Sequence, residues 1–259
     1  MGRRFLILSG LLLFPIATAL FPLSAKASEP VVTAPKTQQT PILTLASPYD
    51  PIEGLNRCFF EFNDAFMLWL IRPLEKVYSF ILPKTARTRI DMIIVNFEFI
   101  IRGVSCLLEG EFNDAWVVTE RFFINLTLGV AGIFDVADDW FDLHPRNEDF
   151  GQAFATWGIG PGFYFVIPIL GPSTFRDAIG EIFFFAFHPV TWLPIPGIGL
   201  FVFVNRASLR IGPYMDTRAA AFDKYATMRD LWYINRLIQI DNLDRIPESS
   251  PDAGKATMK

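Results

Sequence analysis

The chain has 259 residues, a formal net charge of −4 and a charged fraction of 19%, which is below the roughly 25% of an ordinary soluble domain. Phenylalanine accounts for 27 residues and the mean hydropathy is +0.32, so excess apolar surface must either pack into a large core or contact lipid. The negative charge argues against a nucleic-acid partner, and any affinity for a membrane must come from apolar burial.

The N-terminal segment has the composition of an export signal. Arg3 and Arg4 precede an apolar stretch over residues 5–21. Residues 25–27 (AKA) then supply the small residues that a signal peptidase accepts. Residues 1–27 are therefore predicted to be a signal peptide that is cleaved on export. The alternative is a retained anchor, because the stretch is close to the lower length limit of a membrane span.

The remaining chain divides by composition. Residues 28–49 are rich in Pro, Thr, Ser and Gln without a hydrophobic period, which predicts a flexible linker. Residues 50–240 form the predicted helical domain, and residues 241–259 are a polar tail. The chain shows no internal repeat.

Three helices are predicted in the first half of the domain. Apolar residues recur every three or four positions from Asn56 onwards, so a helix that is apolar on most of its circumference is expected until Pro73 breaks or kinks it. A second helix is predicted over residues 85–108, ended by Gly110. A third is predicted over residues 113–127, with its first two residues as caps and a glycine turn after it. Three helices in so short a stretch predict a bundle.

Two long uncharged runs follow, over residues 150–175 and 182–204. Each is long enough for a bilayer span, but glycines and prolines interrupt both, and each internal proline costs a helix about 3 kcal/mol. Broken backbone inside hydrocarbon is tolerated only beside protein or a water-filled cavity. The runs therefore predict contact with lipid without crossing as simple helices, and the first favours an irregular or hairpin-like backbone.

A short helix is predicted where the first uncharged run ends and the second begins. Thr174 and Asp177 have the spacing of a capping box, so the helix should begin there and carry four phenylalanines. The pattern becomes helical again over residues 200–237. An interruption of that long helix is expected at Gly212 and Pro213.

The sequence offers few groups for catalysis. His144 and His188 are its only histidines, and it lacks a Gly-x-Ser-x-Gly elbow, a His-Glu-x-x-His motif and a phosphate loop. No catalytic residue, metal or cofactor is therefore predicted, and a membrane-associated hydrolase is the weakest functional hypothesis. Cys58 and Cys106 lie in helical patterns among apolar residues, which favours two buried thiols, with one disulfide bridge as the alternative.

Four stretches together resemble the MlaA (VacJ) family, the outer-membrane component of the system that maintains lipid asymmetry in Gram-negative bacteria. They occur in the family's order and extend over residues 50–237, nearly all of the predicted domain. The stretches are residues 50–57 (DPIEGLNR), 121–125 (RFFIN) with 132–137 (GIFDVA), 149–152 (DFGQ), and 158–177 from GIGPG to GPSTFRD.

This resemblance implies an all-α fold, a ring-shaped bundle of amphipathic helices in which an irregular Gly/Pro-rich hairpin lines a central channel. It also implies a place in the periplasmic leaflet of the outer membrane, beside a porin trimer. Family members are not enzymes: they let phospholipid that is mislocalised in the outer leaflet descend through the channel to a periplasmic lipid-carrier protein. A soluble periplasmic lipid-binding chaperone is the alternative function.

The cysteines depart from the family pattern. Members are typically lipoproteins with a cysteine directly after the signal, whereas the first cysteine here is Cys58, inside the domain. Without a lipobox cysteine, acylation at the usual place is not expected. Either the apolar surface holds the protein in the leaflet unaided, since monotopic binding scales with buried apolar area, or this member is more soluble.

Three groups of residues are predicted to serve this function. The candidates for lining or gating the channel, with core packing as the alternative, are Gly158, Gly160, Gly162, Phe163, Tyr164, Phe165, Val166, Ile167 and Pro168. The candidates for leaflet contact, where tryptophan favours the interface, are Phe183, Phe184, Phe185, Phe187 and Trp192. The family-motif residues expected to be scaffold are Asp50, Pro51, Gly54, Asn56, Arg57, Arg121, Asn125, Gly132, Asp135, Gly171, Arg176 and Asp177. For Arg176, a contact with a lipid head group is the alternative.

Overall fold

The computed structural model of the chain describes residues 47–241. The predicted signal peptide, most of the predicted linker and the tail from residue 242 lie outside the described residues. Within residues 47–241 the regular structure is helical apart from one two-stranded sheet, so the predicted all-α class is confirmed.

The helices follow one another with short connections. They are α3 (Glu53–Phe66), the π-helix η2 (Met67–Ile71), α4 (Arg72–Ile81), α5 (Lys84–Phe97), α6 (Phe99–Glu109), α7 (Phe112–Thr127), α8 (Val136–Phe141), α9 (Phe150–Thr156), α10 (Phe175–Phe187), α11 (Pro189–Trp192), α12 (Ile198–Ala220) and α13 (Lys224–Ile240). Strands β1 (Tyr164–Ile167) and β2 (Gly171–Thr174) stand between α9 and α10. None of the helices in this part of the chain is long and apolar enough to cross a bilayer.

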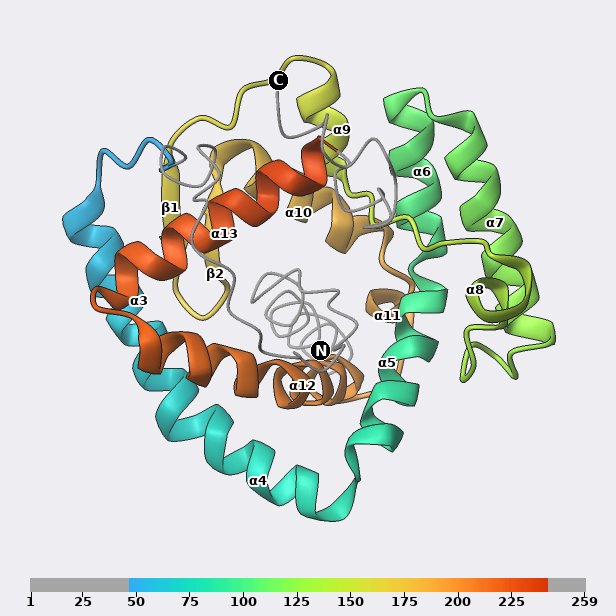
Figure 1. Cartoon of the computed structure of the whole chain (residues 1–259), viewed down its shortest axis with the longest axis horizontal. Coiled ribbons are helices and arrows are strands. Elements are labelled where there is room, and N and C mark those ends of the chain that lie inside the picture. The colour runs from blue at the N-terminus through green and yellow to red at the C-terminus, as the bar shows by residue number, and fades with distance from the viewer. Residues whose placement is uncertain (1–46, 242–259) are drawn as a thin grey trace, which may run out of the picture.

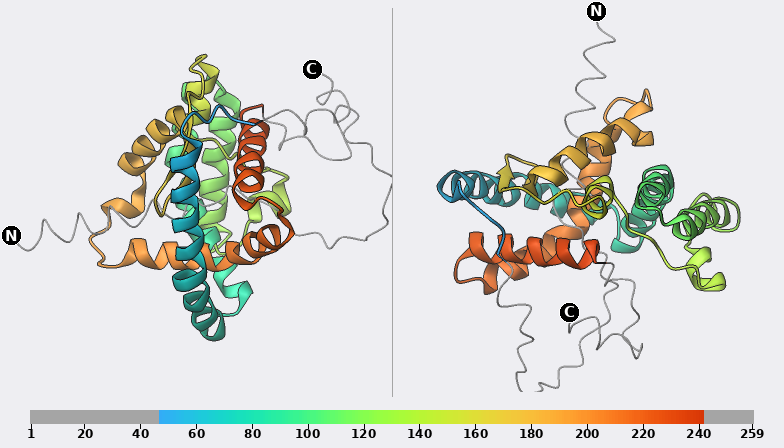
Figure 2. Two further views of the ribbon diagram at one scale, coloured as in Figure 1. Left: turned by 90° about the vertical axis from the view of Figure 1, so that its left-hand side faces the viewer. Right: turned by 90° about the horizontal axis from the view of Figure 1, so that it is seen from above.

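The elements form a ring (Figure 1). Helices α3 to α6 follow its rim, and the hairpin of β1 and β2, together with α9 and α10, closes the ring between α3 and α6. Helix α7 packs outside the rim against α5 and α6, and α8 packs on α7. Seen from above, α10 and α11 rise on one face of the ring and α13 lies across the other (Figure 2).

The largest core lies where the hairpin meets α3, α12 and α13. Strand β1 pairs antiparallel with β2 in a register that sets Tyr164 opposite Thr174, so Tyr164 and Val166 share one face. That face is buried against Phe60, Trp232 and their neighbours. The first uncharged run is thus a hairpin at its centre, as the glycines and prolines predicted.

Pro73 does not end the first helix. The π-helical turn η2 precedes it, with the Arg72 N–H bonded to the carbonyl of Met67 five residues back, and α4 begins at Arg72. Pro73 therefore follows a π-helical turn, whose shifted hydrogen bonds accommodate its missing N–H. The helical path continues to Ile81, so of the predicted break or kink at Pro73, the break does not occur.

The predicted helix over residues 85–108 is two helices that meet at Glu98. There ψ is close to 0° and the carboxylate is buried, with Oε1 accepting from Arg206 Nη2 at 2.6 Å and from His188 Nε2 at 3.3 Å. Burial alone would raise the pKa of Glu98, but Arg206, His188 and Arg102 hold it well below its usual range. The break thus coincides with a tertiary ion pair, and Gly110 ends α6 in the left-handed conformation as predicted.

The predicted interruption at Gly212 and Pro213 is wrong. Helix α12 runs through both residues to Ala220, and the break comes three residues later, where Asp223 accepts the Ala226 N–H at 3.1 Å and caps α13. Packing of α12 against α4 and α5 outweighs the roughly 3 kcal/mol that an internal proline costs.

Two further boundaries differ from the prediction. Helix α7 begins one residue before Asn113, so Asn113 and Asp114 are not its caps, and Asp114 instead binds Arg146 Nε at 2.9 Å. The start of the first uncharged run is the helix α9, although Gly151 lies in its first turn. Gly151 is needed for close packing, because a Cβ there would lie 2.4 Å from Arg236 Nη2.

Candidate functional site

Two asparagines of α3 hold the outer edge of the hairpin. Asn56 is completely buried; its Nδ2 donates to the Tyr164 carbonyl at 3.2 Å and its Oδ1 accepts the Val166 N–H at 2.9 Å. Asn63, one heptad further, makes the same pair of bonds along the strand, 3.0 and 2.6 Å long. The two carboxamides act in place of a third strand and satisfy backbone groups that would otherwise be buried without partners.

A cavity of about 310 Å³ lies between the hairpin, α10 and α13, and we call it the hairpin cavity. Its volume is at the lower end of the roughly 300–1,000 Å³ range of small-molecule pockets, which gives room for a polar head group with part of an acyl chain. The apolar part of its wall consists of Ile167, Leu170, Pro172, Ala178, Gly180, Ile182, Phe184, Phe185 and Trp232. The polar part consists of Asp149, Ser173, Asp177, Glu181, Arg236 and Gln239.

Arg236 of α13 is the centre of the polar part. Its buried guanidinium donates from Nη1 to Asp149 Oδ2 at 2.6 Å, and from Nη2 to Asp149 Oδ1 and Asp177 Oδ1 at 2.8 Å each. Burial disfavours the charge, but the two carboxylates raise the pKa of Arg236 well above its ordinary value. Because Asp149 caps α9 and Asp177 lies in the first turn of α10, this arginine joins three helices.

Asp177 is held from two further sides. Thr174 Oγ1 donates to Asp177 Oδ2 at 2.7 Å and also accepts the Asp177 N–H, so the helix start predicted at Thr174 is confirmed. Arg176 Nη2 lies 3.1 Å from Asp177 Oδ1. Both oxygens of this carboxylate therefore have partners, and Arg176 is used locally.

Glu181, four residues further along α10, lacks such partners. Its Oε2 is buried and makes no hydrogen bond within the described part of the chain. Burial, followed by the negative charge of Asp149, raises the pKa of Glu181 to about 8, against a smaller opposite effect of Arg236. The side chain therefore holds a proton at neutral pH.

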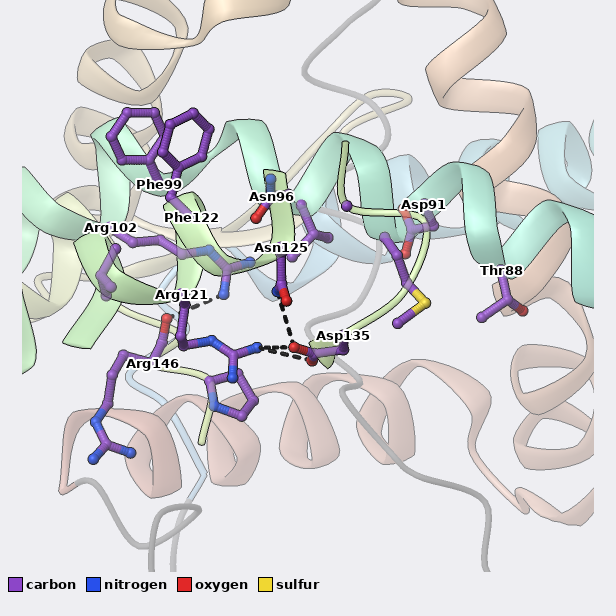
Figure 3. Close-up of a pocket in the computed structure, with 15 residues that line it drawn as sticks. Thr88, Asp91, Asn96, Phe99, Arg102, Arg121, Phe122, Asn125, Asp135 and Arg146 are labelled. Carbon is purple, nitrogen blue, oxygen red and sulfur yellow. Dashed lines mark hydrogen bonds and ion pairs between the residues drawn. The ribbon is translucent and has the colours of Figure 1, made fainter. Parts of the chain in front are cut away.

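A second, smaller pocket of about 130 Å³ lies between α5 and α7, and we call it the Arg121 pocket (Figure 3). Arg121 Nη2 lies 3.0 and 2.8 Å from the two oxygens of Asp135, and Asn125 Nδ2 donates to the same carboxylate at 2.9 Å. Asp135 also accepts the Asp138 N–H and so caps α8. In Figure 3 the side chains of Arg121 and Asn125 both point at Asp135, so this cluster fastens α7 to the loop that follows it.

The residues predicted to line the channel divide between the core and the hairpin cavity. Tyr164 and Val166 are 2% and 3% exposed and belong to the core, whereas Ile167 lines the cavity. Gly158 and Gly162 have φ of 80° and 72°, which glycine adopts without strain, and Gly158 lies in the turn after α9. The remaining members, in neither the core nor the cavity wall, are Gly160, Phe163, Phe165 and Pro168.

The residues predicted to contact the leaflet also divide. Phe183, Phe187 and Trp192 are 43%, 46% and 73% exposed, as leaflet contact requires. Phe184 and Phe185 are half-buried, pack on the small core formed by Ile94 and Val202, and line the hairpin cavity. These two side chains therefore lie on the inner side of α10.

Large aromatic side chains are exposed well beyond α10. Five of the six tryptophans are more than half exposed, although tryptophan is on average highly buried in soluble proteins. They are Trp69, Trp116, Trp140, Trp157 and Trp192. Helix α4 adds Phe80, 91% exposed, and Ile81, 68% exposed. A surface of this kind marks contact with protein or membrane.

Residues 50–57, the first of the stretches that resemble the family, contact α13 and its cap. Asp50 accepts from Asn56 Nδ2 at 2.7 Å and from the Tyr225 hydroxyl, and Arg57 donates two bonds of 3.1 and 2.8 Å to Asp223, the cap of α13. These contacts fit the scaffold role predicted for the motif residues. The same stretch includes Pro51 and Gly54, which are exposed, and positive φ values occur at Gly132 and Gly171.

The cysteines and histidines lie apart from the hairpin cavity. Cys58 and Cys106 do not form a disulfide bridge with each other; Cys106 is buried, but Cys58 is exposed on α3, so the prediction of two buried thiols is wrong for Cys58. His144 is exposed beside α8, with Nδ1 2.8 Å from Asp138. His188 is completely buried, with Nδ1 accepting the Val190 N–H at 3.1 Å, so it caps α11.

Sequence reasoning missed most of the polar residues of the hairpin cavity. Arg236 lies in the charged half of the last helix, 59 residues from Asp177, and no local pattern joins the two. Glu181 stands out in the sequence only as an isolated acid between two apolar runs. An acid in that setting is the pattern that points to a buried polar site.

The comparisons with known proteins agree with this geometry. A family model described as MlaA lipoprotein matches residues 48–239. The chain belongs to the MlaA family. The family resemblance stated from the four motifs is therefore confirmed.

Named relatives come from several bacteria. The intermembrane phospholipid transport system lipoprotein MlaA of Escherichia coli K12 is 32% identical over 151 residues, which is 57% of this chain and 60% of that protein. The protein of the same name from Haemophilus influenzae is 27% identical over 217 residues, 78% of this chain and 84% of that protein. An uncharacterized protein of Rickettsia bellii is 33% identical over 145 residues, 56% of each chain. The chain thus spans about half the length of the Rickettsia relatives that it matches.

A solved structure shares the fold of this MlaA family member. It comes from work on the structural basis for maintenance of bacterial outer membrane lipid asymmetry, and it is similar with a TM-score of 0.64 at 24% identity. The match covers 74% of this chain and 98% of that chain. The ring of helices is therefore the family's fold.

Proposed function

We propose that this protein moves phospholipid between membranes, and that it removes mislocalised phospholipid from the outer leaflet of the outer membrane without chemical change. The observation that carries the proposal is the hairpin cavity, in which an apolar wall faces a charged side. A phospholipid needs such a path, because its chains favour apolar surroundings while its head group requires polar partners. The names of the relatives as phospholipid transport lipoproteins support the same reading.

The exposed aromatic residues support a place in the periplasmic leaflet. Tryptophan favours the boundary between hydrocarbon and head groups, and Trp192 lies at the end of the helical segment whose Phe183 and Phe187 are also exposed. The proposed contact is with one leaflet, which the exposed aromatic surface would enter. The hairpin and α10 would then line a channel through the ring.

The proposed partners follow from this location. Phospholipid enters from the membrane, and a periplasmic lipid-carrier protein receives it after passage. A porin trimer beside the ring would hold it in place. We propose these partners on the basis of family membership.

Photocrosslinking in the membrane tests the proposed path. A photoreactive phenylalanine analogue at Leu170, on the apolar wall, should yield a covalent phospholipid adduct that mass spectrometry identifies in the purified chain. The matched control places the analogue at Asp139, which is exposed on α8 among other acids, and should give no adduct. An absence of phospholipid on the Leu170 derivative would contradict the proposed path.

Flotation with liposomes separates transport in the leaflet from the soluble chaperone hypothesis. The chain should float with vesicles because its exposed aromatic surface inserts into one leaflet. A soluble chaperone would instead remain at the bottom of the gradient with stoichiometric lipid bound.

A further inference from the structure

The acidic groups around the hairpin cavity are not all paired. Three carboxyl groups lie on its wall, those of Asp149, Asp177 and Glu181, against the single guanidinium of Arg236. Arg236 is bound to both aspartates, and the nearby Arg176 is also bound to Asp177. Glu181 is therefore an acid in excess, and its buried Oε2 has no hydrogen-bond partner in the described part of the chain.

A donor without a partner lies on the same wall. Arg236 is only 7% exposed, and its Nε is buried with no acceptor among the described residues. Buried polar atoms are normally hydrogen-bonded, and buried charges are normally paired. The cavity thus combines one unsatisfied acceptor, at Glu181, with one unsatisfied donor, at Arg236, beside an apolar wall.

We propose that the hairpin cavity selects phospholipids whose head group carries a primary amine, with the ammonium at the carboxyl group of Glu181 and the phosphate on the Arg236 side of the cavity. The inference rests on the proposed function, because it names the lipid class that the transport site prefers. A phosphoethanolamine head group supplies both a cationic N–H donor and an anionic acceptor. A glycerol head group brings a net negative charge and no cation, and a choline head group has no N–H to donate.

Proton release should accompany this binding. The pKa of Glu181 is about 8, because burial and then Asp149, with smaller contributions from Asp177 and Glu98, oppose ionisation while Arg236 favours it. An ammonium group beside Glu181 favours the carboxylate, so the amine binds the ionised form. Affinity for the amine lipid should therefore rise with pH between 6 and 8, by at most roughly tenfold per unit, and level off above 8.

Calorimetric titration of the full chain in maltoside micelles tests the selectivity. The probes are dihexanoyl phosphatidylethanolamine, phosphatidylglycerol and phosphatidylcholine, each added to wild type and to Glu181→Gln at pH 8.5. We expect wild type to bind the amine lipid roughly tenfold more tightly than the other two, because a hydrogen bond between charged groups is lost with them. Glu181→Gln should lose this preference and keep its affinity for phosphatidylglycerol.

A matched control and a second measurement keep the test specific. Glu61→Gln removes the same charge from an exposed position of α3 and should bind all three lipids as wild type does. Repeating the wild-type titration at pH 6.5 should weaken only the amine lipid. Glutamine resembles the protonated form that Glu181 has at neutral pH, so the variant should fold normally.

The outcomes separate this inference from the proposed function. Equal affinity of wild type for the three lipids, or an unchanged preference in Glu181→Gln, overturns the amine selectivity and leaves phospholipid transport standing. Failure of wild type to bind any of the three overturns both.

Discussion

The Arg121 pocket and the hairpin cavity both bring arginine and carboxylate groups together inside the protein, but they differ in how completely those groups are used. At the Arg121 pocket, Asp135 receives bonds from Arg121, from Asn125 and from a backbone N–H of α8. At the hairpin cavity, Arg236 satisfies two aspartates while Glu181 keeps a buried oxygen without a partner. The closed set of partners around Asp135 fastens a loop, whereas the unpartnered oxygen of Glu181 leaves binding capacity for a ligand.

The surroundings of the two sites differ in the same sense. Helix α8, next to the Arg121 pocket, carries Asp138, Asp139 and, just after it, Asp142. Helix α10, on the wall of the hairpin cavity, carries Phe183, Phe184, Phe185 and Phe187, and Glu181 is its last charged residue. We therefore expect the α10 side to meet lipid and the acidic end of α8 to stay in water.

Removing one guanidinium from each site should give the largest difference between the two sites, measured as loss of the free energy of unfolding. Arg236→Met leaves two buried carboxylates without their cation, so we expect the free energy of unfolding to fall by about 3–5 kcal/mol. Arg121→Met removes a partly exposed pair in which Asn125 and the helix cap still hold Asp135, so a loss of about 1–3 kcal/mol is expected. Denaturant titration in detergent micelles measures both.

The exposed ion pair of Arg57 and Asp223 provides the control for this series. Its side chains are 41% and 39% exposed, so Arg57→Met should cost within about 1 kcal/mol. Equal losses for Arg236→Met and Arg121→Met would mean that the two sites are equivalent parts of the scaffold, against the comparison drawn above.

Local rules predict the fold where local interactions decide it. Gly110 ends α6 in a left-handed conformation, and Thr174 caps α10, because each effect needs only a few neighbouring residues. The break predicted at Pro213 is wrong, because packing of α12 outweighs the cost of the proline, and at Pro73, where a break or a kink was predicted, a π-helical turn keeps the chain helical. At the break at Glu98, the carboxylate is bound by Arg206, which lies 108 residues away.

The candidate site was still less accessible to sequence reasoning. Its walls come from the hairpin, α10 and α13, so the meeting of Arg236 with Asp149 and Asp177 exists only in the tertiary structure. The prediction of a hairpin found the right segment. Which of its side chains face the cavity depends on the strand register, which buries Tyr164 and Val166 in the core and leaves Ile167 on the cavity wall. Only Glu181, an acid between two apolar runs, indicated a buried polar site from the sequence.

The pH dependence of the free energy of unfolding should also distinguish the hairpin cavity, through Glu181, but by a smaller amount. The pKa of Glu181 is about 8 in the folded protein, above its ordinary 4.5, so the folded state binds more protons between these values. The free energy of unfolding therefore falls as pH rises through this window, by at most about 1.4 kcal/mol per unit from this group. Glu181→Gln should remove that part of the slope in denaturant titrations between pH 6 and 8. An identical slope in the variant would show that Glu181 is ionised and paired.

The smallest expected effect concerns which side of the ring enters lipid, and it compares two tryptophans of nearly equal exposure. Trp192 follows the apolar α10 and is 73% exposed, whereas Trp140 is 72% exposed on the acidic α8. Trp192→Ala should weaken binding to neutral phospholipid vesicles by about 1 kcal/mol, roughly fivefold, because apolar area is withdrawn from the leaflet. Trp140→Ala should leave vesicle binding unchanged, because the carboxylates beside it keep that end of the molecule in water. Co-flotation at several lipid concentrations measures both, and a larger effect of Trp140→Ala would reverse the orientation and place the α8 arm in the membrane.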